Sequence, residues 1–168
     1  SVTWEMLVRM DALEDQDGNV TRTCIMGNEQ DGGWAFYNSD YASTFSYTHK
    51  SGVKSSVKNF NGSRVLVPGR FYHLVVTMDR TSHVIRYFVN GQLVRTGTRV
   101  ATDMPLPQCG TIKGHQGMWI CLGGDATSGA CDSKAENSSA CSFVFARIYD
   151  GALTETAAAN LYNDEVIS

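Results

Sequence analysis

Prolines, long apolar runs and clusters of basic residues are all scarce in this sequence. Three prolines stand against sixteen glycines among 168 residues, and this ratio favours many tight turns, as in an all-β domain. No apolar run approaches the roughly 20 residues that a membrane-spanning helix needs, so membrane insertion is not expected. The formal net charge is −3 and lysine and arginine are dispersed, which argues against electrostatic capture of nucleic acid.

Signatures of the common enzyme classes are also missing. The sequence contains no P-loop, no H-E-x-x-H zinc motif, no G-x-G-x-x-G dinucleotide motif and no G-x-S-x-G nucleophile elbow. Spacing identifies no general base among the four histidines, which are His49, His73, His83 and His115. Catalysis by this chain is therefore not expected.

The five cysteines favour disulfide bonds over a metal site. No C-x-x-C pair occurs and no histidine lies at zinc-finger spacing from a cysteine, which disfavours structural zinc. We predict that Cys131 and Cys141 close a Ser/Ala/Asn-rich loop, and Cys109 with Cys121 is a second candidate pair. Spacing alone does not determine the pairing. Cys24 lies in an apolar run and is expected to be a buried free thiol; the alternative is that all five cysteines are reduced and buried.

The clearest strand pattern lies in the middle of the chain. Phe71–Met78 and Val84–Val89 are rich in β-branched and aromatic residues and are separated by a turn-like segment. Asn90-Gly91 then precedes a third run, Gln92–Arg95. Asn-Gly between two such runs is the strongest short-range hairpin signal, because both turn positions need positive φ. Three consecutive antiparallel strands are therefore predicted between residues 71 and 95.

Shorter strand-like runs flank this region, and Thr154 can cap a terminal helix with Glu155 in its first turn. Regularly spaced strands without alternating helices predict an all-β, antiparallel two-sheet sandwich, a jelly roll with one short C-terminal helix, over residues 1–168 as a single domain. A strand follows Ser1 almost at once, so we expect either a mature fragment or a domain of a longer protein. The other strands are expected at Trp4–Met10, Thr21–Met26, Trp34–Tyr37, Tyr41–His49, Val53–Phe60, Met118–Leu122 and Phe143–Tyr149.

Several segments resemble laminin-G-like domains of the concanavalin A-like lectin/glucanase class. Gly69–Asp79 resembles the family segment G-x-W-x-H-V-x-x-T-x-D, with Phe71 in place of the usual tryptophan and His73 at the position of a structural histidine. Tyr87–Val94 resembles the hairpin Y-V-N-G-x-L-V. The remaining similar segments are Trp119–Asp125 (family W-I-x-I-G-G), Ala146–Thr154 (R-I-Y-D-x-A-L-T) and Val2–Arg9 (F-T-V-E-x-W-V-R, with Trp4 shifted).

These segments occur in the family's order from Val2 to Asn163, and the resemblance implies a jelly-roll fold. The resemblance is closest to the accessory domains found in secreted and surface proteins of carbohydrate-using gut bacteria. This fold hosts lectins, adhesion modules, pentraxins and glycosidases, so it does not determine the function. The glycosidases place paired carboxylates as E-x-D-x-x-E or E-x-D-x-E on one strand, and no such triplet occurs here.

We therefore expect a non-catalytic, lectin-like module that binds a glycan or polysaccharide. The alternative is a protein-interaction or adhesion module with another protein as partner, and a glycoside hydrolase is the least favoured reading. Disulfides and the resemblance imply an extracellular, cell-surface or periplasmic location.

Sugar binding needs exposed aromatic faces and polar partners. Tyr41, Tyr47 and Trp119 are the candidate stacking rings, and Asp125 is the candidate polar contact. Asp125 follows two glycines at a predicted strand end, which makes it a candidate ligand for Ca²⁺ as well as a residue that could simply cap a turn. Most large rings of such a sandwich are core residues, and this is expected of Trp4, Trp34 and Tyr87.

Overall fold

The computed structural model describes residues 1–11, 23–27, 34–38, 43–51, 54–61, 66–79, 81–98, 120–123 and 140–164. The side chains of residues 23, 47–51, 54–61, 98 and 121 are outside this description.

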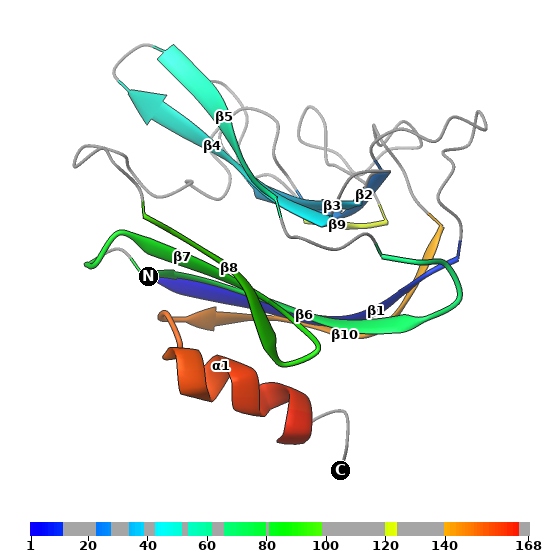
Figure 1. Ribbon diagram of the computed structural model, residues 1–168. Helices are drawn as coiled ribbons and strands as arrows, with labels where there is room; N and C mark the ends of the chain where they lie inside the picture. Colours follow the sequence, from blue (N-terminus) through cyan, green and yellow to red (C-terminus); the bar gives the residue numbers. More distant parts are fainter. Residues whose placement is uncertain are drawn as a thin grey trace.

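The strands form two antiparallel sheets that lie over one another as two layers (Figure 1). The first sheet has the order β10-β1-β6-β7-β8, with β1 at Val2–Met10, β6 at Phe71–Asp79, β7 at Val84–Val89, β8 at Gln92–Thr98 and β10 at Cys141–Asp150. The second has the order β5-β4-β3-β2-β9, with β2 at Thr23–Gly27, β3 at Trp34–Asn38, β4 at Ser43–Ser51, β5 at Lys54–Asn61 and β9 at Cys121–Leu122. The predicted all-β sandwich is confirmed.

The hairpins of the central region form as the sequence predicts. β6, β7 and β8 are consecutive antiparallel neighbours. Asn90 and Gly91 connect β7 to β8, and both have positive φ, 50° and 71°. This is the backbone conformation that makes Asn-Gly a strong hairpin signal.

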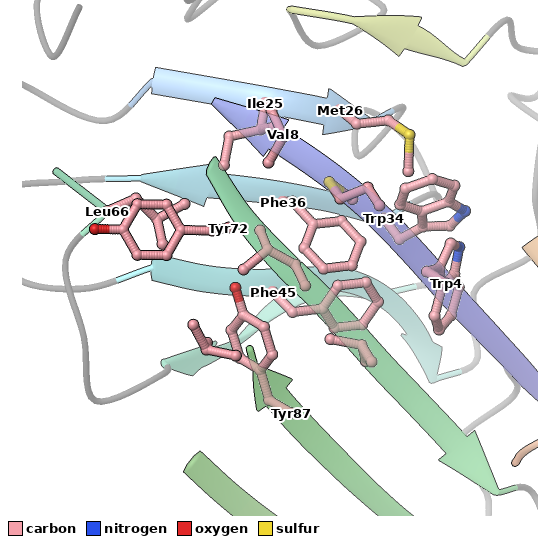
Figure 2. Close-up of a cluster of buried hydrophobic side chains, with 14 of the residues drawn as sticks. Trp4, Val8, Ile25, Met26, Trp34, Phe36, Phe45, Leu66, Tyr72 and Tyr87 are labelled. Atoms are coloured by element: carbon pink, nitrogen blue, oxygen red, sulfur yellow. The ribbon is translucent and has the colours of Figure 1, made fainter. Parts of the chain in front are cut away.

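Aromatic side chains fill the space between the two sheets (Figure 2). The rings of Trp4 and Trp34 lie 5.2 Å apart between centroids, and Phe45 packs 4.8 Å from Trp4. Phe36 contacts both Phe45 and Tyr87 at edge-to-face angles, an arrangement that aromatic quadrupoles favour. The predicted core positions of Trp4, Trp34 and Tyr87 are confirmed.

A β-bulge interrupts the pairing of β1 with β10. Leu7 pairs with Phe145 and Val8 pairs with Phe143, so Val144 is an additional residue in β10. A bulge changes the face to which the following side chains point. Phe143 accordingly packs against the core, whereas Phe145 contacts the ring of His73 on the opposite face of the sheet.

The C-terminal helix α1 (Glu155–Tyr162) packs on the outer face of the first sheet (Figure 1). The backbone N–H of Ala157 donates to the Thr154 side chain at 3.2 Å, and Glu155 lies in the first turn, as predicted. Ala158 packs with Val75 and Phe88. No helix in the described part of the chain is long and apolar enough to cross a membrane.

Candidate functional site

The predicted ligand contacts fall almost entirely outside the described residues. This applies to Tyr41, Trp119 and Asp125, and therefore also to the candidate Ca²⁺ ligand. Tyr47 lies in β4, where its backbone pairs with Trp34, but its side chain is not described. These assignments remain predictions. Within the described ranges, no three His, Cys, Asp or Glu side chains are grouped as a metal site would require.

The cysteine predictions also remain open. Cys109 and Cys131 lie outside the described residues, and Cys121 is described only by its backbone in β9. Cys141 begins β10 opposite Met10 and is half-buried. Cys24 is completely buried, as predicted for this position.

The described side chains on the outer face of the second sheet are buried. Cys24, Ala35 and Tyr37 form a buried cluster separate from the main core, and Tyr37 is only 2% exposed. Thr44 and Ser46 on the neighbouring strand β4 are buried too. A sugar needs an accessible ring face for stacking, so Tyr37 cannot act as a stacking platform in this conformation.

A cluster of polar side chains lies buried on the outer face of the first sheet. The Glu5 carboxylate is at its centre, with Oε1 2.8 Å from Nε2 of His73. Its Oε2 accepts a hydrogen bond from the Tyr149 hydroxyl and lies 3.5 Å from an Arg147 nitrogen. The Tyr162 ring of α1 lies 5.9 Å from the His73 ring. The cluster thus joins β1, β6 and β10 beneath the helix.

The environment of Glu5 favours its ionised form. Burial by itself raises the pKa of a carboxyl group. Hydrogen bonds with His73 and Tyr149, together with attraction to His73 and Arg147, outweigh that effect and lower the pKa of Glu5. Burial and the hydrogen bond to Glu5 raise the pKa of the Tyr149 hydroxyl.

The centre of this cluster is shielded from solvent, while Arg147 and Tyr149 at its edge are partly exposed, and the arrangement is suited to structure more than to catalysis. The side chains of Glu5 and His73 have no exposed surface, so a substrate cannot reach them in this conformation. A glycosidase needs two carboxyl groups on either side of the scissile bond, and Glu5 has a histidine, a tyrosine and an arginine around it. Sequence reasoning missed Glu5, because an acid that alternates with apolar residues in a strand is typical of a solvent-facing position.

A second polar group lies at the far end of β1 and is accessible. The Nε of Arg9 donates to Asp11 at 2.8 Å, and its Nη2 donates to the Ser142 hydroxyl at 3.2 Å. The Ser142 hydroxyl in turn donates to the other Asp11 oxygen at 2.8 Å. Hydrogen bonds with Ser142 and Arg9 lower the pKa of Asp11. The guanidinium of Arg9 also lies over the ring of Phe71.

Two further carboxylates serve local contacts. Asp79 accepts hydrogen bonds from the Ser82 hydroxyl and the Thr81 backbone N–H in the β6–β7 turn, and these bonds lower its pKa. Glu155 lies 3.5 Å from Arg86 and is largely exposed. Asp79 thus stabilises a turn and Glu155 a helix–strand contact.

Comparison with known sequences gives a family match over almost the whole chain. The family described as the concanavalin A-like lectin/glucanases superfamily (Laminin_G_3) matches residues 1–159. No curated protein matches the sequence.

Solved structures with this fold include carbohydrate-binding domains. A candidate carbohydrate binding protein from Bacteroides ovatus is 19% identical with a TM-score of 0.60, covering 92% of this chain and 38% of its own. The CBM40 domain of the IT-sialidase from Ruminococcus gnavus is 15% identical with a TM-score of 0.66, covering 96% of this chain and 82% of its own. The same domain bound to α2,3-sialyllactose is similar with a TM-score of 0.63 and 14% identity, covering 96% of this chain and 81% of its own. At these identities the likeness establishes the fold alone. This chain spans well under half of the length of the Bacteroides protein and most of the length of the Ruminococcus domain.

Proposed function

Because the chain belongs to the concanavalin A-like lectin/glucanase superfamily, we propose that it is a non-catalytic carbohydrate-binding module of a secreted or cell-surface protein. The observation that carries this proposal is the shared two-sheet architecture with CBM40, which extends over 96% of this chain. That domain has been solved with sialyllactose bound. A match to 38% of the Bacteroides protein supports a module within a longer polypeptide.

The setting of Glu5 supports the non-catalytic part of the proposal. This carboxylate is sealed inside the protein and its pKa is lowered. A catalytic acid needs access to the glycosidic oxygen and a raised pKa. Glu5 is inaccessible to a substrate, and its pKa is lowered.

The proposal assigns the ligand contacts to Tyr41, Tyr47, Trp119 and Asp125, as the sequence predicts. The aromatic rings would stack on sugar C–H faces, and Asp125 would accept hydroxyl hydrogen bonds or bind Ca²⁺. Trp119→Ala is expected to weaken glycan binding about tenfold, the loss that corresponds to one aromatic contact. Trp4→Phe, a conservative change in the core, is the matched control and should leave binding unchanged once the variant is folded.

A glycan array probed with the purified domain, in calcium and in EDTA, tests the function directly. We expect a defined subset of glycans to bind, with the hits confirmed by affinity electrophoresis in soluble polysaccharides. Heat-denatured domain is the control for non-specific adsorption. Silence in both buffers, on the array and in the gels, would contradict carbohydrate binding.

The alternative of a protein-interaction module is favoured by one specific observation. Large apolar side chains are exposed in or beside the edge strands β9 and β10, where an exposed apolar surface can mark a protein contact. They are Ile120, Leu122, Val144 and Ile148, with exposures between 40% and 61%. A double variant, Leu122→Ser with Ile148→Ser, should abolish capture of a protein partner and leave glycan binding intact if this alternative holds.

A further inference from the structure

Three neighbouring strands of the first sheet bring three different side chains into one row. Arg9 of β1 pairs with Ser142 of β10 on one side and with Phe71 of β6 on the other. Residues in direct register across adjacent strands point to the same face of the sheet. Arg9, Ser142 and Phe71 therefore form a lateral row on the outer face, which we call the outer-face row.

Hydrogen bonds with Asp11, which lies beside the row, hold its polar part rigidly. Arg9, Asp11 and Ser142 are each bonded to the other two, at distances of 2.8 to 3.2 Å. The backbone N–H of Asp11 donates to the Ala140 carbonyl at 2.8 Å, which fixes the residue that follows β1. Groups held in this way lose little conformational freedom when a ligand binds.

The bulge at Val144 is what places Ser142 in the row. Without the bulge, regular alternation of β10 back from Phe145 would direct Ser142 to the core and Cys141 outward. With it, Cys141 packs against the core and Ser142 bonds to Arg9 and Asp11. Bulges are frequent next to binding sites, where they redirect a side chain.

The apolar part of the row is an accessible aromatic ring. Phe71 is 46% exposed, although it begins a strand whose next seven residues are all buried. The guanidinium carbon of Arg9 lies over the ring, 5.3 Å from its centroid, and the exposed surface of Phe71 is what remains beside this contact. Helix α1 packs further along β6, against His73 and Val75, and leaves Phe71 in contact with solvent.

We propose that the outer-face row, together with Asp11, is a binding subsite for a neutral sugar residue. The inference rests on the proposed carbohydrate-binding function and adds a site in a different sheet from Tyr47. The ring of Phe71 offers a stacking surface for the C–H face of a pyranose. Arg9 keeps N–H donors beyond the two it uses, and Asp11 keeps acceptor positions, so both can bond to hydroxyl groups at the sugar's edge.

Charge determines the class of sugar. The positive charge of Arg9 is already balanced by Asp11, at 2.8 Å. A carboxylated sugar would gain little attraction from Arg9 and would meet the Asp11 carboxylate. The subsite therefore favours neutral glycans over acidic ones.

Affinity electrophoresis of the whole domain tests the inference with named probes. The neutral gels contain xyloglucan, galactomannan or mixed-linkage β-glucan, and the acidic gel contains polygalacturonate. Phe71→Leu removes the aromatic face, and Asp11→Asn removes the charged acceptor. Phe71→Trp keeps an aromatic ring at this position. Ile148→Ala is the matched control, because Ile148 is 47% exposed in the same sheet but pairs with the core residue Trp4. Thermal unfolding shows that each variant is folded, and Asp11→Asn tests the site if Phe71→Leu fails to fold.

We expect a neutral polysaccharide to retard the wild type, with affinity about tenfold lower in Phe71→Leu and Asp11→Asn. Phe71→Trp and Ile148→Ala should bind like the wild type. Retention of full affinity by both Phe71→Leu and Asp11→Asn overturns the subsite while the proposed function stands. If polygalacturonate is the only polysaccharide that retards the wild type, the inference that the subsite prefers neutral sugars is overturned. A wild type that binds no probe, in the gels or on the array, overturns both proposals together.

Discussion

The Nε2 atom of His73 lies 2.8 Å from Oε1 of Glu5, although the two residues are 68 positions apart in the chain, and neither side chain is exposed. The contact joins β1 to β6, and Tyr149 and Arg147 extend it to β10. A buried charge is costly unless it is fully paired. Loss of the Glu5 carboxylate is therefore expected to destabilise the first sheet.

Glu5→Gln should lower the free energy of unfolding by about 3 kcal/mol, because it leaves buried partners without the carboxylate they were arranged to bind. Urea unfolding at neutral pH measures the change. Glu155→Gln is the matched control: the Glu155 side chain is 57% exposed and its carboxylate lies 3.5 Å from Arg86, so loss of the charge should cost less than about 1 kcal/mol. Equal effects of the two substitutions would contradict the structural role of Glu5.

The same residue should make stability depend on pH in the acid range. The pKa of Glu5 is lowered in the folded protein from an ordinary value of 4.5. Its contribution is therefore fully present above pH 4.5 and is lost as the pH falls through the folded pKa. Unfolding measured from pH 7 to pH 3 should show the stabilities of wild type and Glu5→Gln converging in acid. A constant difference across that range would show that Glu5 does not titrate as described.

Gly27→Ala should destabilise the second sheet by about 1–3 kcal/mol, the usual cost of overpacking. A Cβ at this position would lie 2.3 Å from the Ala35 Cβ and 2.6 Å from its Cα on the neighbouring strand. Thermal unfolding measures the loss. Adding Ala35→Gly removes the Cβ–Cβ clash but leaves those with the Ala35 Cα and with the Trp34 carbonyl oxygen, 2.8 Å away, so the double variant should recover part of the stability. No loss in the single variant would mean that β2 and β3 lie further apart than described.

Asn38→Ala should cost about 2 kcal/mol, because it leaves buried backbone groups unsatisfied. The Asn38 amide accepts a hydrogen bond from the Leu66 N–H at 3.0 Å and donates to the Leu66 carbonyl at 3.1 Å. Hydrogen exchange should show faster exchange of the Leu66 amide in the variant. Unchanged protection at that amide would mean that Asn38 does not hold this segment.

Peptide mapping without reduction tests the cysteine predictions. We expect a cross-linked peptide that contains Cys131 and Cys141. Cys24 is completely buried, so alkylation of the native protein should leave it unlabelled and unfolding should expose it. Labelling of Cys141 and Cys131 in the native protein would exclude the predicted bond.

Local patterns in the sequence were sufficient for the architecture. Period-two runs predict the strands, and Asn90-Gly91 predicts the β7–β8 turn because few residues tolerate positive φ at both positions. Thr154 predicts the start of α1 because its hydroxyl accepts a backbone N–H of the first turn. Each of these signals depends on residues that are close together in the chain.

Tertiary structure alone decided the features that depend on register between distant strands. Alternation by itself places Phe143 and Phe145 on the same face of β10, but the bulge at Val144 sends one to the core and the other outward. The alignment of β1 with its two neighbours likewise brings Arg9 beside Phe71 and Ser142. A shift of one residue in either pairing would turn these side chains to the other face, and no pattern within a single strand reports that pairing.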